Sequence, residues 1–449
     1  PPAPSAQLLG DTPEAVAFAI DGADDRAVMA AARLMERGLQ VRVAEKDFRL
    51  GDRSFARGAV VVTTLDNRAH VDDVRPPLVA VLGELGLQAT ALRTGLGPGD
   101  LPDLGGAHFV LLEQPRIALL GRGAMSTTAF GWLWHALDHE LAIRHSPVAE
   151  DGSFDMSRYN VLIHPGGGRP REGLVPRTRD WVRNGGTLIL IGGIPPEFLA
   201  DSAELTQVRP LEEVLDKLDS YELTVLREWL SREDHAHDTV SIWSPRVPTD
   251  LSYPWPALKT GRPEKEELKR RDEWQRLFMP QGALLAGRVD TRHWLTAGCS
   301  DRLPLMVGRE PVLMAGQGVE APIRYGVFHA ASTNTVSGSD EAPGATEASS
   351  GTGRKDGTPA KPAEVRRAGW AALPPGTDLH LRMSGLLWPE ASHRLANAAW
   401  ITRQGVGRGQ VICFATHPAF RGATPAMTRV LLNAVVCGPG FGTARDIRP

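Results

Sequence analysis

The amino-acid sequence predicts an α/β protein whose main sheet is mostly parallel and doubly wound by helices. Residues 116–120, 159–165 and 187–191 are short apolar runs typical of buried strands. Helical patterns follow the first two runs, over residues 127–140 and 175–184. Short strands that alternate with helices at this spacing favour a doubly wound parallel sheet.

Length and composition narrow the classes of protein to consider. A chain of 449 residues is long enough for two or three domains. Its net charge of −3 predicts no nucleic-acid partner and no acidic-membrane partner, since both need a basic surface. No apolar run reaches the roughly 18–20 residues of a membrane-spanning helix. The chain begins with Pro1 rather than Met, so we expect a processed or excised chain.

The three cysteines, Cys299, Cys413 and Cys437, are scattered and form no C-x-x-C pair. Three cysteines so far apart in the sequence argue against a thiolate zinc site and against a disulfide framework.

Shifts in composition divide the chain into segments, and each segment has its own expected structure. The expected segments are a loose leader at 1–12, a small α/β domain at 13–113, a larger α/β domain at 114–200, 281–333 and 367–440, a helical insertion at 201–280, and a low-complexity, mobile insertion at 334–366. Within the larger domain, residues 283–330 are expected to be a β-containing extension of short strands. The helical insertion is expected to hold helices over 211–229 and 264–278.

The segment 187–199 has the pattern of a strand, a glycine turn and the start of a helix. In many α/β enzymes such a turn carries a Ser or Cys nucleophile. Here the turn consists of Gly192, Gly193 and Ile194, none of which can attack a carbonyl. His417 ends a late strand, but no carboxylate occupies the positions just after it. A catalytic residue is therefore not expected at this turn.

Glycines follow three of the predicted strands and define an expected ligand edge. In parallel sheets of this kind, ligands bind at the carboxyl ends of the strands. The glycines match neither G-x-G-x-x-G nor a phosphate-binding P-loop, so they serve either turn packing or a backbone nest for a carboxylate or oxyanion. The candidate edge residues are Gly121, Gly123, Gly166, Gly167, Gly192, Gly193 and His417.

A metal site is not expected, because none of the thirteen histidines has Glu three residues later. The pattern H-x-x-D occurs at His70, His135 and His235. The best cluster for a metal would be residues 234–238, which we interpret as a solvated turn. No cofactor is expected in this chain.

Six stretches resemble a known family. They are residues 115–120, 160–167, 181–189, 384–390, 407–414 and 432–439. Together they resemble the C-terminal, non-peptidase half of bacterial zinc carboxypeptidases of the M14 family. The resemblance implies a class I glutamine-amidotransferase-like, flavodoxin-like domain in the larger segment. It also implies a secreted or periplasmic location and a partner zinc peptidase domain, in which the zinc and the catalytic residues lie.

Three functions follow as hypotheses. The first is an auxiliary, non-catalytic portion of such a carboxypeptidase, which packs on the zinc domain that hydrolyses peptide C-termini. The second is a small-molecule module that binds an anion or a sugar at a degenerate amidotransferase-like site. The third is a hydrolase that uses His417 with an unidentified acid. Whether the chain forms a homo-oligomer is left open.

Overall fold

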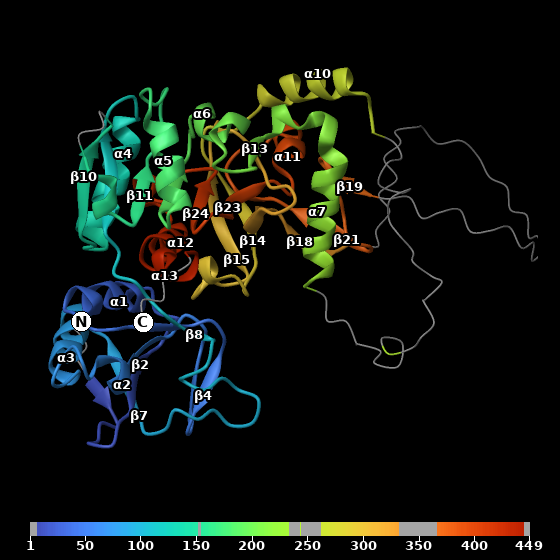
Figure 1. Ribbon diagram of the computed structural model, residues 1–449. Coiled ribbons are helices and arrows are strands. Elements are labelled where there is room, and N and C mark those ends of the chain that lie inside the picture. Colours follow the sequence, from blue (N-terminus) through green and yellow to red (C-terminus); the bar gives the residue numbers. More distant parts are fainter. Residues whose placement is uncertain (1–6, 151–153, 233–242, 244–261, 332–365, 444–449) are drawn as a thin grey trace, which may run out of the picture.

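The protein is a mixed α/β molecule in which helices α1 (Arg26–Glu36) and α12 (Pro425–Val436) lie between two sheets (Figure 1). The computed structural model describes residues 7–150, 154–232, 243, 262–331 and 366–443. The low-complexity insertion expected at 334–366 lies outside the described residues, except for its last residue.

The N-terminal part is a six-stranded sheet covered by helices. Its strand order is β1-β7-β2-β6-β3-β8. The strands are β1 (Gln7–Leu9), β2 (Ala17–Ile20), β3 (Arg42–Ala44), β6 (Val60–Thr63), β7 (Gln88–Leu92) and β8 (Phe109–Leu111), with a hairpin of β4 (Phe48–Leu50) and β5 (Arg53–Phe55) beside them. The helices are α1 (Arg26–Glu36), α2 (Thr64–Asn67) and α3 (Arg75–Leu85). Because β1 pairs with β7, an ordered strand lies inside the expected leader.

The larger part contains a twelve-stranded sheet. Five parallel strands form one half of it, in the order β10-β9-β11-β12-β24. They are β9 (Ile117–Arg122), β10 (His145–Ala149), β11 (Val161–His164), β12 (Thr187–Ile191) and β24 (Gly409–Phe414). Every residue of β11, β12 and β24 is buried, as continuous apolar runs in a parallel sheet predict.

The other half of this sheet is antiparallel and continues through β23, β17, β14 and β15. These strands are β14 (Ala283–Val289), β15 (Arg302–Val307), β17 (Glu320–Tyr325) and β23 (Ala399–Val406), with β13 (Arg209–Pro210), β16 (Leu313–Met314) and β22 (Arg382–Ser384) paired at the side. The expectation of a mainly parallel sheet is therefore correct for one half only. A tight turn at Gly407 joins β23 to β24, and such a turn forces antiparallel pairing.

Small sheets and helices complete the larger part. The small sheets pair β18 (Val327–Ala330) with β21 (Thr377–His380), and β19 (Arg367–Ala368) with β20 (Ala371–Ala372). The helices are α4 (Thr127–His135), α5 (Leu174–Arg183), α6 (Pro196–Leu199), α7 (Leu218–Leu230), α10 (Lys265–Arg276), α11 (Pro389–Leu395), α12 (Pro425–Val436) and α13 (Gly438–Phe441).

Two of the expected helices have different boundaries. The helix expected over 127–140 is α-helical to His135 and ends in a π turn, Ala136–Glu140. The helix expected over 211–229 begins as two 3₁₀ turns, Leu211–Glu213 and Leu215–Lys217, before α7 starts. The extended Pro210 and the non-helical Val214 between the turns prevent one continuous helix.

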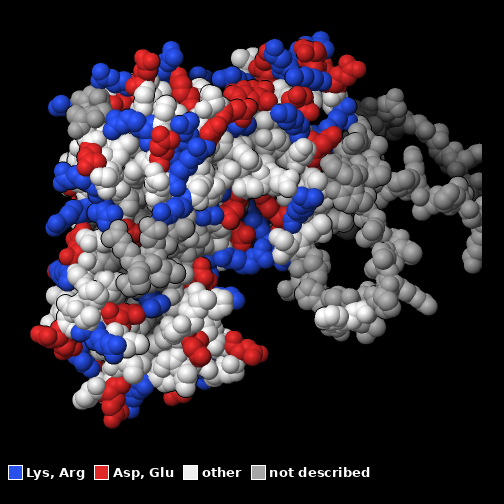
Figure 2. Space-filling view, viewed as in Figure 1, with Lys and Arg blue, Asp and Glu red and all other residues white. Residues whose placement is uncertain are grey.

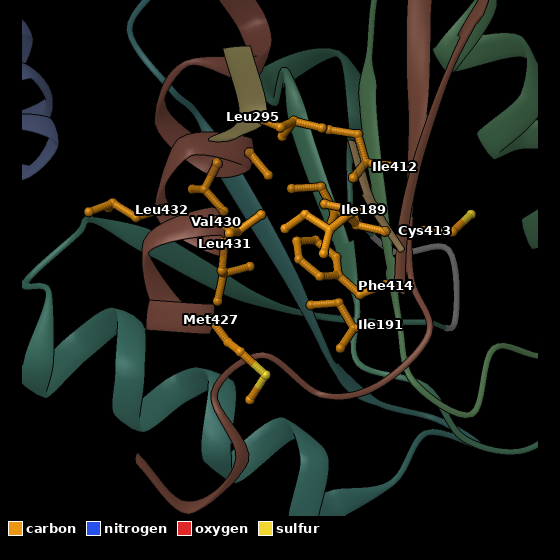
Figure 3. Close-up of a cluster of buried hydrophobic side chains, with 14 of the residues drawn as sticks. Ile189, Ile191, Leu295, Ile412, Cys413, Phe414, Met427, Val430, Leu431 and Leu432 are labelled. Atoms are coloured by element: carbon orange, nitrogen blue, oxygen red, sulfur yellow. The ribbon is translucent and has the colours of Figure 1, made fainter. Parts of the chain in front are cut away.

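Helix α12 lies at the centre of the core, and all its residues from Met427 to Val436 are buried. Figure 3 shows Met427, Val430 and Leu431 directed toward Ile189, Ile191, Ile412 and Phe414 of strands β12 and β24. On another side α12 contacts α1 of the N-terminal part. One helix therefore belongs to the cores of both parts.

Polar side chains also fix the two parts to one another. Arg429 of α12, only 2% exposed, donates to Asp25 Oδ1 at 2.9 Å and to Gly22 O at 3.0 Å. Arg57 of the N-terminal part donates to His293 O at 2.8 Å and to Thr296 O at 2.7 Å. These bonds satisfy buried donors that would otherwise cost stability.

Candidate functional site

The residues of the expected ligand edge lie in one assembly of loops at the carboxyl ends of β9, β11 and β12. A backbone bridge joins Met125, after β9, to Gly167, after β11. The Gly167 amide donates to Gly193 O at 3.1 Å, which connects the loop after β12. An added Cβ at Gly192 would lie 3.4 Å from His417 N, after β24. The structure therefore brings the predicted residues together.

Several of these glycines are required by packing inside the protein. A Cβ on Gly166 would overlap Gly192 O, and one on Gly121 would press on the Phe130 ring. Gly166, Gly167, Gly192 and Gly193 all have positive φ, which other residues rarely adopt. The amides of Gly166, Gly167 and Gly192 are already bonded within the protein. The edge is thus closed by its own loops.

The Glu150 carboxylate accepts hydrogen bonds from two backbone amides of the neighbouring loops. Glu150, just after β10 and 5% exposed, accepts from Ala124 N at 3.0 Å and from Arg171 N at 2.5 Å. A Cβ on Gly123 would overlap this carboxylate, so glycine is required there. The Ala124 and Arg171 amides next to the candidate glycines therefore bind an anion supplied by the chain itself.

Two buried histidines lie at this edge, and both are held neutral. His417 Nδ1 accepts from Ala419 N at 3.2 Å, so its Nε2 carries the proton and donates to Ala129 O at 3.0 Å. His164 Nδ1 accepts from Gly166 N at 3.1 Å. Burial lowers the pKa of each imidazole to about 4.

Neither histidine has the partners of a catalytic base. The His417 ring contacts the Trp132 ring, with centroids 5.1 Å apart, and its nitrogens bond to backbone groups. The His164 ring contacts Phe198. A general base must reach the nucleophile that it activates, and the turn at Gly192 and Gly193 carries no nucleophile. This geometry argues against a hydrolase based on His417.

The cysteines are also unsuited to nucleophilic catalysis. Burial raises the pKa of Cys413 and of Cys437 to about 12, and that of Cys299 to about 11. The thiolate is the reactive form, so these thiols are inert near neutral pH.

Among the described residues, no group of three or more His, Cys, Asp or Glu side chains is arranged to hold a metal ion. His135 lies on the surface with its Nδ1 3.4 Å from Glu140 Oε1. The cluster at 234–238 lies outside the described residues. Within the part of the chain that the structure describes, no helix is long and apolar enough to cross a membrane.

An open groove of about 770 Å³ lies beside the closed glycine edge. One wall is the loop of residues 169–173 after β11, and the other is α6 with the turn Asp201–Ala203. Arg169, whose side chain is 87% exposed, approaches Glu197 with 3.3 Å between Nε and Oε1. Glu197 Oε2 is buried without a hydrogen-bond partner. The groove is thus bordered by an exposed guanidinium and by the carboxylate that is paired with it.

Sequence reasoning did not identify Glu150, His164, Arg169 or Glu197. Glu150 and His164 directly follow or end strands of the parallel half, and Arg169 follows a glycine run. A polar residue at the end of such a strand could have been recognised as a candidate, because the carboxyl ends of parallel strands lie at one edge of the sheet. The sequence could not show that Glu150 folds back over Gly123.

Comparisons with known proteins give no family. No protein-family model matches the chain. No curated protein matches it either.

Solved structures that align along most of the chain are beta-galactosidases. The enzyme from Bacillus circulans sp. alkalophilus aligns with 87% of this chain and 38% of its own, at 10% identity and a TM-score of 0.31. The GH42 enzyme Gan42B aligns with 81% of this chain and 34% of its own, at 11% identity and a TM-score of 0.25. The enzyme from Rahnella sp. R3 aligns with 95% of this chain and 50% of its own, at 11% identity and a TM-score of 0.25. The chain spans half or less of these proteins, and such TM-scores do not establish a shared fold.

These findings correct the expected relationship to M14 carboxypeptidases and to class I glutamine amidotransferases. The aligned structures named above are glycosidases, and no family model or curated protein of either expected class matches. Four of the six stretches contain buried strands of the parallel half, whose apolar composition many α/β proteins share. Of the other two, 384–390 is an exposed segment that leads into α11, and 432–439 lies in α12 and α13. The expected zinc peptidase partner and the secreted or periplasmic location rested on that resemblance and lose its support.

Proposed function

We propose that the larger part contains a flavodoxin-like unit that binds a small polar ligand, an anion or a sugar, without chemical turnover. The five parallel strands support the fold assignment, since their order is 2-1-3-4-5 when they are numbered along the chain. In such sheets the ligand site lies outside the carboxyl ends of the strands.

The observation that carries this proposal is the groove between Arg169 and Glu197. The exposed guanidinium can bind an anionic oxygen with two N–H groups. The Glu197 side chain lines the groove and is 37% exposed, so its carboxylate can accept a hydroxyl or ammonium proton. A ligand with both kinds of group, such as a sugar acid, would use both walls of the groove.

The glycine edge beside the groove has no reactive side chain, which supports binding rather than catalysis. The turn has no nucleophile, the two histidines are neutral and bonded to the backbone, and Glu150 already binds the Ala124 and Arg171 amides. Glu150 also fixes the loop at Arg171, which forms one wall of the groove. A rigid wall lowers the entropy cost of binding.

The test is a thermal-shift screen of the full chain against neutral monosaccharides, sugar acids, amino acids and inorganic phosphate. Each ligand that raises the melting temperature is then titrated by calorimetry. We expect Arg169→Ala and Glu197→Gln to weaken binding at least about tenfold, or roughly 1.4 kcal/mol. Arg177→Ala is the control, since Arg177 is an exposed arginine outside the groove. A flat screen would count against the proposal, as would affinities that neither groove variant changes.

A further inference from the structure

An aromatic surface lies far from the glycine edge in the sequence and uses none of its residues. It consists of Trp274, Phe278 and Trp388, and the same two segments of the chain also carry the exposed residues Leu277, Met383 and Leu386. Trp274 is 57% exposed and Trp388 is 49% exposed. Large exposed apolar side chains gathered in one place mark interaction sites more often than single ones do. We call these six residues the aromatic platform.

The three rings of the platform hold one another in place. The centroids of Trp274 and Phe278 are 5.1 Å apart, and those of Phe278 and Trp388 are 6.0 Å apart. Both pairs are inclined at 61°, so the contacts run from edge to face. Both indoles therefore remain exposed while their orientation is restrained. A preorganised surface of this kind loses little entropy when a ligand binds.

Helix α10, which carries Trp274, is attached by a buried ion pair and by Leu268, which packs against the core. Its buried residue is Asp272, which accepts from Arg394 of α11 with Oδ1 and Nε 2.7 Å apart. Arg394, only 3% exposed, also donates to Glu212 at 3.2 Å. Since the ion pair anchors the helix, Trp274 and Leu277 are not required for its core packing.

A cavity of about 410 Å³ adjoins the platform at Leu277, which borders both. Charged residues line it, among them Glu273, Arg276, Arg309 and Glu310. Glu310 Oε2 is buried and has no hydrogen-bond partner. Burial raises the pKa of the Glu310 carboxyl above its usual range. The cavity therefore offers polar groups that a ligand rich in hydroxyls can satisfy.

We propose that the platform and this cavity form a binding site for an oligosaccharide. A sugar ring has an apolar C–H face, which can lie on the exposed indoles of Trp274 and Trp388. Its hydroxyls both donate and accept, so they suit a cavity with carboxyl and guanidinium groups. A volume of about 410 Å³ is within the usual range for small-ligand sites.

The surroundings favour a sugar over a protein partner. Charged residues are depleted in the cores of protein interfaces. Here Arg271, Glu273 and Arg276 flank Trp274 on α10. Figure 2 shows acidic and basic side chains crowded together along α10, at the top of the view. The site shares no lining residue with the groove at Arg169 and does not rest on the function proposed for that groove.

The experiment titrates the full chain with soluble cello-, xylo- and galacto-oligosaccharides, followed by calorimetry. We expect Trp274→Ala and Trp388→Ala each to weaken binding at least about tenfold, and Glu310→Gln to weaken it less. Trp134→Ala is the matched control, because Trp134 is a partly exposed tryptophan of α4 outside the platform. Thermal melts confirm that each variant is folded, and Arg169→Ala should leave this binding unchanged.

Two results would overturn the proposal. One is the absence of heat with all three sugar classes at concentrations of about 10 mM, where even weak lectin-like sites with Kd near about 1 mM are occupied. The other is binding that both tryptophan variants leave unchanged. If sedimentation shows self-association that Trp388→Ala abolishes while no sugar binds, the platform is a protein contact and the proposal fails.

Discussion

At the scale of single residues, the loops of the glycine edge are held in place by hydrogen bonds between their own buried polar groups. Glu150 binds two loop amides, and His164 and His417 each accept one backbone N–H at Nδ1. The partners of Glu150 could not be identified from the sequence, because they lie 26 and 21 residues from it and that separation does not fix their approach in space. The histidine contacts are local, each with the amide two residues later in the chain. The candidate residues Gly166, Gly167, Gly192 and Gly193 could be identified, because glycine after a buried strand signals a turn.

Replacement of Glu150 by alanine should destabilise the protein by about 1–3 kcal/mol, because two backbone amides lose their acceptor in a buried site. Urea unfolding measures this change. Glu172→Ala, an exposed acidic residue on the same loop, should change stability by less than about 0.5 kcal/mol. Equal stability of the two variants would show that the Glu150 carboxylate does not hold these loops.

The two histidines predict a dependence of stability on pH. Their folded pKa of about 4 is below the value of 6.5 for an exposed imidazole. Between these values the unfolded chain binds more protons, so stability is full above pH 6.5 and falls as the pH drops toward 4. Each histidine should contribute a loss on the order of 3 kcal/mol across that window.

Urea unfolding at about pH 7 and about pH 5 measures this loss. Replacement of His417 by glutamine should reduce the difference between the two conditions, because glutamine does not titrate. The exposed His139→Gln variant should behave as the parent. An unchanged difference in His417→Gln would contradict a neutral, buried imidazole.

At the scale of elements, most strands and helices could be predicted, but their pairing could not. Strand β12 spans the predicted residues 187–191, since a short apolar run between turn residues is unambiguous. The antiparallel half of the large sheet was not expected. Strands β14, β15 and β17 lie in the expected β extension at 283–330, whereas β23 was not predicted. Periodicity does not state which neighbour a strand pairs with. Turn length decides that, as the tight connection between β23 and β24 shows.

Contact between the turns after β11 and β12 gives a prediction for Gly166→Ala. The added methyl group would overlap Gly192 O, and φ is +81°. We expect a loss of stability of at least about 2 kcal/mol, measured by thermal and urea unfolding. Gly131→Ala, in α4 with open space around it, should instead be neutral or stabilising by up to about 1 kcal/mol. If Gly166→Ala unfolds with the same stability as the parent protein, the turns after β11 and β12 are not in close contact.

At the scale of the whole molecule, the two parts should unfold together because α12 belongs to both cores and Arg429 bonds across the junction. Arg429→Met removes those bonds and leaves Gly22 O without this donor. Asp25 is 57% exposed and stays hydrated, so the cost comes mainly from the buried Gly22 O that loses its donor. We expect a loss of about 1–3 kcal/mol and a split of one calorimetric transition into two. The exposed Arg302→Ala should retain a single transition. Two transitions in the parent protein would contradict this coupling.

The central claim is that the groove beside the glycine edge binds a small polar ligand and leaves it chemically intact. The most direct measurement is calorimetric titration of the full chain with the ligand that stabilises it most, followed by NMR analysis of the ligand after long incubation. The account predicts saturable binding, weakened at least about tenfold by Arg169→Ala, and full recovery of unchanged ligand. Conversion of the ligand by the parent chain, abolished by His417→Ala, would contradict the claim, and so would the same affinity in the parent and in Arg169→Ala.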